Sequence, residues 1–444
     1  MTTSRTRAVP GALIVFVLLL SASPAFGADT YTIDFENENA SISGPYVTFY
    51  GAAFSSTPQG ADGTSIGLEE SYLLSMLMNG IDEMPTDWGG NLYISDSALT
   101  ETSPNPTITT DTTRYQVIEF AGSGTSAAPD ITYINWYSFP VKLASTTSQS
   151  SQTRGMPNSG QDLDALPAAL ASLSIQSPTN TTVVRNAENE ILRVIGPSNG
   201  NGPDGSVTDK YPSFGDYIDA TFPDATPIST ILIDNTYSGV QSPPNVRFEN
   251  QDYTTSSISY DGSTLTINGS TTRIFAFTLT AEISEESLSE KIYRAVIDYD
   301  YSYMETDGGS TTMGSGNTGS NDVLATVTRD LLAGFAFGFI GSDAEGDMTS
   351  AEWQDATGYF GDIQPDDPFY NEWAGIMNEY FSDVYTFPFS DFLSSTVFTP
   401  TIQVEGDDTL TITLLAVPEP ARFLQLGVAV LVLALRRRNI AADL

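Results

Sequence analysis

Short runs of β-forming residues, separated by turn residues, fill the chain from Thr30 to about Lys142, and this pattern limits the fold more than any other feature. The runs are rich in Ile, Val, Tyr, Phe and Thr, and Gly, Pro, Ser, Thr and Asn separate them. The clearest predicted strands are 31–35, 91–94, 115–120 and 131–143. Closely spaced short strands are typical of an antiparallel sandwich or barrel. A mainly β fold follows.

The middle of the chain mixes helical and β patterns. Residues 145–160 and 308–321 are predicted loops because they are rich in Ser, Thr, Gln, Gly and Asn. Predicted helices are 162–175, with an alternative start at Pro167, and 214–222, 322–340, 349–357 and 371–381. Predicted strands are 191–195, 256–260, 263–267, 273–279, 401–404 and 409–415. This order predicts a β domain at 28–160, a mixed α/β insertion at 161–384, and a return to the β domain at 385–416.

The composition excludes several kinds of catalytic and metal-binding site. The chain has no His and no Cys, which excludes a Ser-His-Asp or Cys-His catalytic unit, a zinc site of the usual ligands and any disulfide. It has 55 Asp and Glu against 17 Lys and Arg, and the net charge of −38 disfavours nucleic acid and anionic lipid as partners. We expect no cofactor and assign no metal site, and any catalysis would use carboxylates, Tyr, Lys or a hard metal ion.

The N-terminal residues 1–27 have the pattern of a signal peptide. Arg5 and Arg7 form a basic start, Ala12–Leu20 is an apolar run, and Ala25–Gly27 has the small residues of a cleavage site. An N-terminal membrane anchor is the alternative, but the run is shorter than the ~20 residues that a membrane span needs. Export with removal of this segment by signal peptidase is expected.

The C-terminal residues 417–444 resemble the PEP-CTERM sorting signal of Gram-negative bacteria. Val417–Pro420 contains the Pro-Glu-Pro motif, Phe423–Leu435 is apolar, and Arg436–Arg438 follows. The resemblance implies Sec export, transient membrane anchoring through the apolar segment, cleavage by an exosortase, and a final place on the outer surface or in the extracellular matrix. A plain C-terminal transmembrane tail is the alternative.

Three separate segments resemble glycoside hydrolase family 64, the thaumatin-like β-1,3-glucanases. The first block runs from Gln116 to Val141, and the second contains Leu192–Pro197 followed by Tyr211–Ile218. The third block, Tyr385–Phe392, matches the closing Tyr-x-Phe-Pro segment of that family. The order and spacing of the three blocks agree with the family pattern.

The resemblance implies a thaumatin-like β-barrel and a mixed α/β domain, with an acidic groove between them that binds β-1,3-glucan. Family members are inverting hydrolases that use one Glu as general acid and one Asp as general base. By motif, Glu119 takes the position of the acid, and Asn135 takes the position of the base. An amide cannot accept a proton from water, so the base is missing at this position.

The local pattern also predicts how the two positions lie. If the first block forms an antiparallel hairpin with its loop centred near Ala127, Glu119 and Asn135 are opposite or diagonal neighbours on one face. Asp130 would then lie in the loop, where an ordinary turn role is the simpler interpretation and a displaced base is the alternative.

Further residues are candidates for sugar binding. Trp88, Trp136, Trp353 and Trp373 could stack on a pyranose ring, and packing in the core is the alternative for each of them. Trp136 is the first candidate because it neighbours Asn135, although strand alternation would turn it to the opposite face. Asp216 on a predicted helix and Asp391 in the third block complete the candidates. Ser390 stands where the family has the first Asp of a pair.

Three functions remain open from the sequence. The chain is an exported hydrolase acting on β-1,3-glucan, a glucan-binding module that has lost catalysis, or a structural protein of the extracellular matrix. Asn135 and Ser390 favour the binding module.

Overall fold

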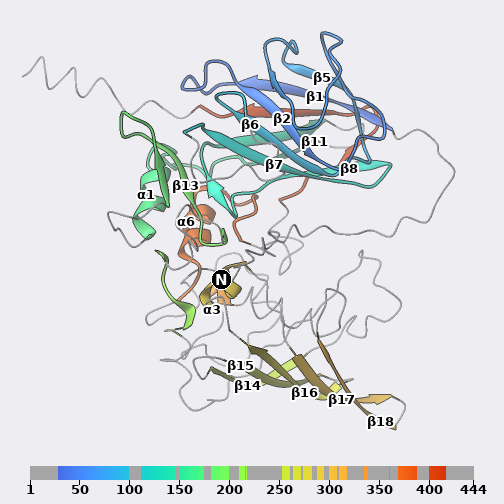
Figure 1. Ribbon diagram of the computed structural model, residues 1–444, viewed down its shortest axis with the longest axis vertical. Coiled ribbons are helices and arrows are strands. Elements are labelled where there is room, and N and C mark those ends of the chain that lie inside the picture. Colours follow the sequence, from blue (N-terminus) through green and yellow to red (C-terminus); the bar gives the residue numbers. More distant parts are fainter. Residues whose placement is uncertain are drawn as a thin grey trace, which may run out of the picture.

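The computed structural model describes residues 29–99, 112–146, 151–174, 182–199, 210–215, 217, 253–260, 264–271, 274–282, 288–294, 300–307, 310–317, 335–338, 360, 369–387 and 400–416. The prediction of a mainly β chain with some helix is confirmed. Two six-stranded sheets lie face to face at one end, a three-stranded sheet with α1 and α6 lies beside them, and a five-stranded sheet lies at the opposite end (Figure 1). No helix among the described residues is long and apolar enough to cross a membrane.

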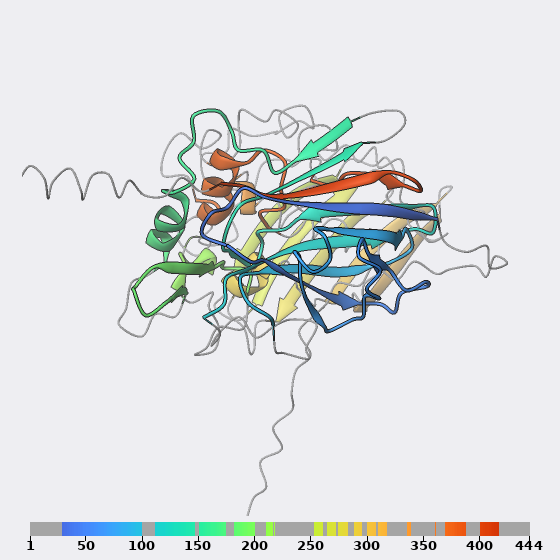
Figure 2. The same ribbon diagram turned by 90° about the horizontal axis from the view of Figure 1, so that it is seen from above.

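The first six-stranded sheet joins the two ends of the described chain. Its order is β11-β10-β20-β1-β5-β3. The strands are β1 (Thr30–Asn37), β3 (Gln59–Gly60), β5 (Gly80–Pro85), β10 (Val141–Thr146), β11 (Ser151–Arg154) and β20 (Thr409–Leu414). β20 pairs in parallel with β1 and antiparallel with β10, and Figure 2 shows the red β20 between the blue β1 and the green β10. The last strand therefore completes the sheet that the first one begins.

The second six-stranded sheet is antiparallel and supplies the other half of the sandwich core. Its order is β19-β8-β7-β6-β2-β4. The strands are β2 (Tyr46–Gly51), β4 (Ser71–Leu73), β6 (Gly90–Ser95), β7 (Tyr115–Gly122), β8 (Ser126–Ile131) and β19 (Val404–Glu405). Phe49, Leu92 and Ile118 on its inner face are completely buried, as are Ile33 and Ile412 of the first sheet. Each such side chain contributes about 1.5–3 kcal/mol by leaving water.

The smaller elements pack beside the sandwich. The three-stranded sheet has the order β12-β13-β9, with β12 at Val183–Arg185, β13 at Ile191–Ile195 and β9 at Trp136–Tyr137. Helix α1 (Leu166–Leu173) begins later than the predicted 162 because Pro lies at its first turn. Helix α6 (Glu372–Tyr380) agrees with the predicted 371–381, and the Asn371 side chain caps it by accepting a hydrogen bond of 3.2 Å from the Ala374 N–H.

The five-stranded sheet is a simple antiparallel meander. Its strands are β14 (Tyr253–Tyr260), β15 (Thr264–Thr271), β16 (Ile274–Glu282), β17 (Asp300–Asp307) and β18 (Ser310–Asn317). The predicted loop 308–321 is wrong over β18, which pairs with β17 along its whole length. The predicted loop 145–160 is likewise wrong at β11. In both segments Thr and Ser form strand backbone once a neighbouring strand supplies hydrogen-bond partners, because β propensity depends on context.

Two further elements depart from the prediction. Helix α3 (Leu288–Arg294) lies in a region where only strands were expected, and a Glu290–Arg294 ion pair of 3.2 Å joins its successive turns. The predicted strand 131–143 is three pieces, because the chain leaves β8 at Ile131, forms β9, and passes Pro140 before entering β10 in the other sheet. The predicted helix 349–357 lies outside the described residues, as do most of the predicted helices 214–222 and 322–340.

Two adjacent glycines offer a matched test of packing in the sandwich. A Cβ at Gly90 would lie 2.4 Å from the Tyr50 carbonyl oxygen and 2.6 Å from the Trp88 ring, whereas at Gly89 the nearest atom would be at 3.6 Å. We expect Gly90→Ala to lower the free energy of unfolding by about 1–3 kcal/mol, since overpacking forces the backbone apart. Gly89→Ala is the control and should change it by less than about 0.5 kcal/mol. Urea unfolding measures both, and equal effects would contradict the close approach at Gly90.

Candidate functional site

Glu119 points away from the sandwich core, on the outer face of the second sheet. Its neighbours Ile118 and Phe120 are buried on the inner face, whereas Glu119 is exposed. The register places Asn91 of β6 and Asp130 of β8 directly opposite Glu119. Residues paired across a sheet share a face. The outer face therefore carries a continuous polar row, made of Tyr50, Asn91, Glu119, Asp130 and, through an isolated bridge, Thr401.

On one side of the polar row, aromatic packing covers the outer face. The Tyr93 and Trp136 rings stack with centroids 6.2 Å apart, and the Trp136 Nε1–H donates to the Tyr115 carbonyl at 3.2 Å. The Arg193 guanidinium lies 4.1 Å from the centroid of the Tyr115 ring. All four side chains are buried. This half of the face is closed to a ligand.

On the other side of the polar row, the face is open and lined by small or polar side chains. Ala121 and Ala128 are paired across β7 and β8, and neither is buried. Gln403 and Glu405, on the neighbouring segment, are exposed. Small side chains leave the sheet surface accessible to a flat ligand. Glu119 thus lies at the border between a covered half and an open half.

The environment of Glu119 changes its acidity. Loss of surrounding water raises the pKa of the Glu119 carboxyl to about 7. The side chain nonetheless keeps solvent-accessible surface on the outer face. Burial raises the pKa of Tyr93, and the charges of Tyr115 and Glu119 add to that rise. Glu119 is therefore partly protonated at neutral pH, as a general acid must be.

Asn135 does not lie opposite Glu119, and the predicted hairpin geometry is wrong. The turn between β7 and β8 is at Gly124 and Thr125, not near Ala127, and Asp130 takes the place opposite Glu119. Asn135 lies in a bend between β8 and β9, half-buried, and its carbonyl accepts from the Gly196 N–H at 2.9 Å. The signal for the true turn was Gly124, which has φ +85° and is first in a two-residue loop.

The three tryptophans among the described residues do not offer a ring face to a sugar. Trp136 is 3% exposed, and Trp88 and Trp373 are each 1% exposed, so their ring faces are occupied by protein. The expectation that Trp136 stacks on a sugar is corrected: its position after a bend brings it under β7, where Tyr93 and Tyr115 enclose it. Trp353, Asp216, Ser390 and Asp391 lie outside the described residues.

The first and second blocks identified in the sequence meet beside the polar row. Trp136 and Tyr137 of β9 pair with Ile195 and Val194 of β13. Arg193 of the same strand also reaches the first block through the Tyr115 ring. The two segments thus form one sheet and cover the same half of the outer face.

The third block joins the first at the end of β8. Tyr385 forms a parallel bridge with Thr132, its N–H donates to the Ile131 carbonyl at 2.9 Å, and its carbonyl accepts from the Tyr133 N–H at 2.8 Å. The Trp373 Nε1–H donates to the Tyr133 carbonyl at 2.9 Å, which fixes α6 at the same place. Three segments that are far apart in the sequence therefore converge within a few residues of Asp130.

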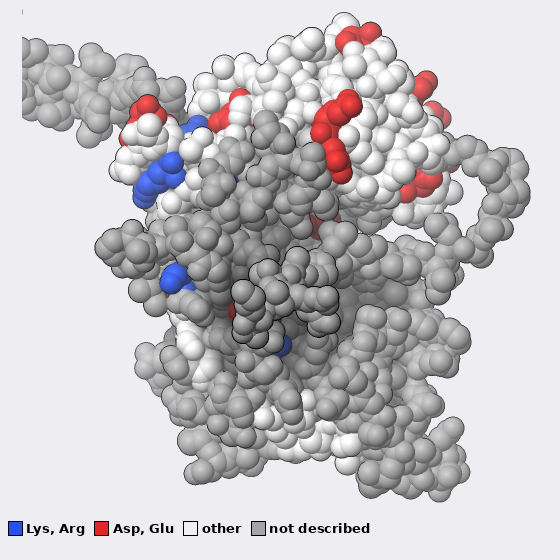
Figure 3. Space-filling view, viewed as in Figure 1, with Lys and Arg blue, Asp and Glu red and all other residues white. Residues whose placement is uncertain are grey.

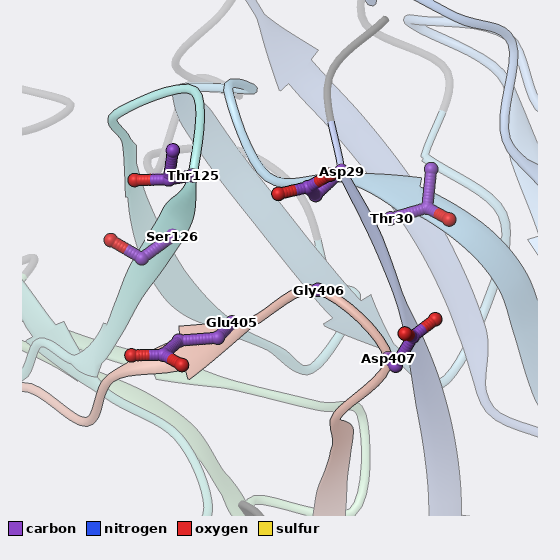
Figure 4. Close-up of a pocket in the computed structure, with 7 residues that line it drawn as sticks. All are labelled: Asp29, Thr30, Thr125, Ser126, Glu405, Gly406 and Asp407. Carbon is purple, nitrogen blue, oxygen red and sulfur yellow. The ribbon is translucent and has the colours of Figure 1, made fainter.

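A pocket of about 630 Å³ lies beside the turn between β7 and β8, next to the paired Ser126 and Glu405 at the end of the open half. It is lined by Asp29, Thr30, Thr125, Ser126, Glu405, Gly406 and Asp407, with the carboxylates of Asp29, Glu405 and Asp407 around its opening (Figure 4). On the face of the sandwich that Figure 3 shows, acidic side chains are scattered among the described residues. Among the described residues no group of three or more His, Cys, Asp or Glu is arranged to hold a metal ion.

Together, the sheets and the polar row define a β-sandwich protein with a carboxylate site on the outer face of one sheet. No family model matches the sequence, and no curated protein matches it. Among solved structures it is similar to a laminaripentaose-producing β-1,3-glucanase in complex with laminaritetraose, at 14% identity over 88% of this chain and 100% of the other, with a TM-score of 0.49.

Two further solved structures are similar. One is a β-1,3-glucanase domain (GH64) from Clostridium beijerinckii, at 13% identity over 88% of this chain and 100% of the other, with a TM-score of 0.46. The other is a GH family 64 laminaripentaose-producing β-1,3-glucanase from Paenibacillus barengoltzii, at 11% identity over 87% of this chain and 75% of the other, with a TM-score of 0.47.

Proposed function

We propose that this protein hydrolyses β-1,3-glucan on the outer face of its second sheet, with Glu119 as the general acid. The observation that carries the proposal is the meeting of three sequence blocks at this face. Each block resembles family 64 in sequence, and β9, β13 and Tyr385 bring them together beside the polar row. Chance matches scattered over a long chain would have no reason to meet at one site.

The chemistry of the site suits a neutral polysaccharide. The protein carries a net charge of −38, which repels polyanions but leaves an uncharged glucan free to approach. The open half of the outer face offers small and polar side chains beside an acid whose pKa is about 7. In hydrolysis, Glu119 would donate its proton to the glycosidic oxygen as the bond to C1 breaks, while a water molecule attacks C1 and loses its proton to a second carboxylate, a role that Asn135 cannot take.

A binding module that has lost catalysis is the second candidate, and Asn135 favours it. The family pattern requires a carboxylate at this position, and the amide cannot activate water. Asn135 is also engaged through its backbone, because its carbonyl holds the Gly196 N–H at 2.9 Å. Such a module would keep the open half of the outer face and bind glucan without cleaving it.

Export and surface attachment form a separate part of the proposal. The segment 1–27 would be removed by signal peptidase, and the segment 417–444 would anchor the chain until an exosortase cleaves near Pro418–Pro420. This sorting supports a place on the cell surface or in the extracellular matrix, where a polysaccharide substrate or ligand is available. A purely structural matrix protein would share the sorting but would have no affinity for glucan.

The first test is whether the full chain binds and cleaves laminarin. Migration in native gels with and without laminarin measures binding, and release of reducing ends measures hydrolysis. Retardation together with reducing ends supports the hydrolase, and retardation alone supports the binding module. No retardation and no reducing ends would overturn the glucan assignment in both forms and leave the structural role.

A further inference from the structure

Asp130 is the second carboxyl group at the site, although its sequence context predicts an ordinary turn residue. It lies in β8 directly opposite Glu119 in β7, so the two side chains leave the same face of the sheet. Directly opposed residues have Cβ atoms about 4.5–5.5 Å apart. The two side chains can therefore bring their carboxyl groups within hydrogen-bond distance of each other.

The surroundings of the two carboxyls differ. Asp130 is 8% exposed and lies between β7 and the Thr401 bridge, whereas Glu119 faces the open half of the outer face. Two adjacent carboxylates, one of them buried, repel each other when both are charged, and the usual outcome is that one proton stays with the pair. The buried member then controls how tightly the exposed member holds that proton.

We propose that Glu119 and Asp130 form a cross-strand carboxyl pair that shares one proton, with Asp130 as the positioning residue for the acid. The inference rests on the proposed role of Glu119 and deepens it. Asp130 need not touch the glucan. Its part is to keep the proton on the pair at neutral pH, so that the exposed Glu119 oxygen can deliver it.

Other titratable side chains lie around the pair, on the neighbouring strands and on the covered half of the outer face. Tyr93 and Tyr50 belong to the neighbouring strands β6 and β2, and Tyr115 belongs to β7 itself. Arg193 lies over the Tyr115 ring on the covered half. Glu405 shares the outer face but lies opposite Ser126, four residues along β8 from Asp130, or about 14 Å away. At physiological ionic strength that separation exceeds the screening length of about 8 Å.

The test is a titration of the full chain by ¹³C NMR, with label in the Glu and Asp side-chain carboxyls. The Glu119 signal is the one absent from Glu119→Gln. We expect its midpoint, near 7, to fall by about one pH unit or more in Asp130→Asn, because the neighbouring charge is removed. The control Glu405→Gln removes a charge from the same face and should leave the midpoint within about 0.3 units.

A second titration, of the Asp130 carboxyl, tests the pair even if Asp130→Asn does not fold. Glu119 is exposed and tolerates Gln, and a shared proton couples the two signals, so the Asp130 carboxyl signal should show an inflection near pH 7 in the unmodified chain and lose it in Glu119→Gln. If the Glu119 midpoint stays unchanged in a folded Asp130→Asn, or the Asp130 signal shows no inflection near pH 7 in the unmodified chain, the pair does not exist.

These titrations need no glucan, so they separate the inference from the proposed function. If the two carboxyls are coupled in a chain that does not bind laminarin, the proposed function is refuted and the pair is supported. If the chain cleaves laminarin but the two carboxyls titrate independently, the proposed function is supported and the pair is refuted. In a chain that cleaves laminarin, the pH at which activity falls on the alkaline side should also be lower in Asp130→Asn. A purely structural role of Asp130 would not cause this change.

Discussion

Glu119→Gln is expected to lower the rate of laminarin hydrolysis by about 10²–10⁴-fold, the usual contribution of a general acid. Gln has nearly the shape of Glu but has no proton to give to the leaving oxygen. Because the side chain is exposed on the outer face and holds no part of the core, the variant should fold normally. Its affinity for laminarin in native gels should stay close to that of the unmodified chain, since the open half of the face is unchanged.

The pH dependence of the hydrolysis rate provides a second test of Glu119 as the general acid. Glu119 acts only when protonated, and its pKa is raised to about 7 by the loss of surrounding water. Activity should therefore be retained below neutral pH and fall as the pH rises through about 7. An ordinary surface Glu, with a pKa of about 4.3, would have lost its proton several units earlier. Initial rates between pH 4 and pH 9 measure this limb.

Glu38→Gln is the control for the loss of activity. It removes the same functional group from an exposed position just after β1, in the other sheet of the sandwich. Its rate should stay within about twofold of the unmodified chain. If Glu119→Gln and Glu38→Gln have equal rates in a chain that cleaves laminarin, the acid is another residue and the site lies elsewhere.

The β character of the chain could be predicted from the sequence because it depends on local pattern. Turn residues separate the runs at 31–35, 91–94 and 115–120, and each run became a strand within a few residues of its predicted bounds. Segments whose state depends on a distant partner were missed. β18 and β11 are rich in Thr and Ser and become strands only because β17 and β10 lie beside them.

The site was harder to predict because register decides it. Glu119 was identified by motif, and its direction away from the core follows from alternation along β7. The residue opposite it depends on where the hairpin turns, and a shift of the turn from Ala127 to Gly124 replaced Asn135 by Asp130. Trp136 was misplaced for the same reason, since the bend before β9 turns its ring under Tyr93.

Arg193→Met is expected to lower the free energy of unfolding by about 3 kcal/mol, a large effect for one polar side chain. Arg193 is completely buried, its guanidinium lies 4.1 Å from the centre of the Tyr115 ring, and it donates to the Thr113 carbonyl. Burial raises the pKa of Asp96, and the charges of Arg114 and Arg193 oppose that rise. Met keeps most of the volume but loses the charge, the donor and the ring contact.

Arg114→Met is the control, since this side chain belongs to the same corner of the protein but lies nearer the surface. Arg114 pairs with Glu190 at 3.5 Å, and the Glu190 side chain is 57% exposed, so its loss should cost less than about 1 kcal/mol. Urea unfolding of the two variants measures the difference. Arg193 holds β13 against β7, and so joins the second block to the first. A small effect of Arg193→Met on the free energy of unfolding would mean that this contact does not keep the covered half of the outer face closed.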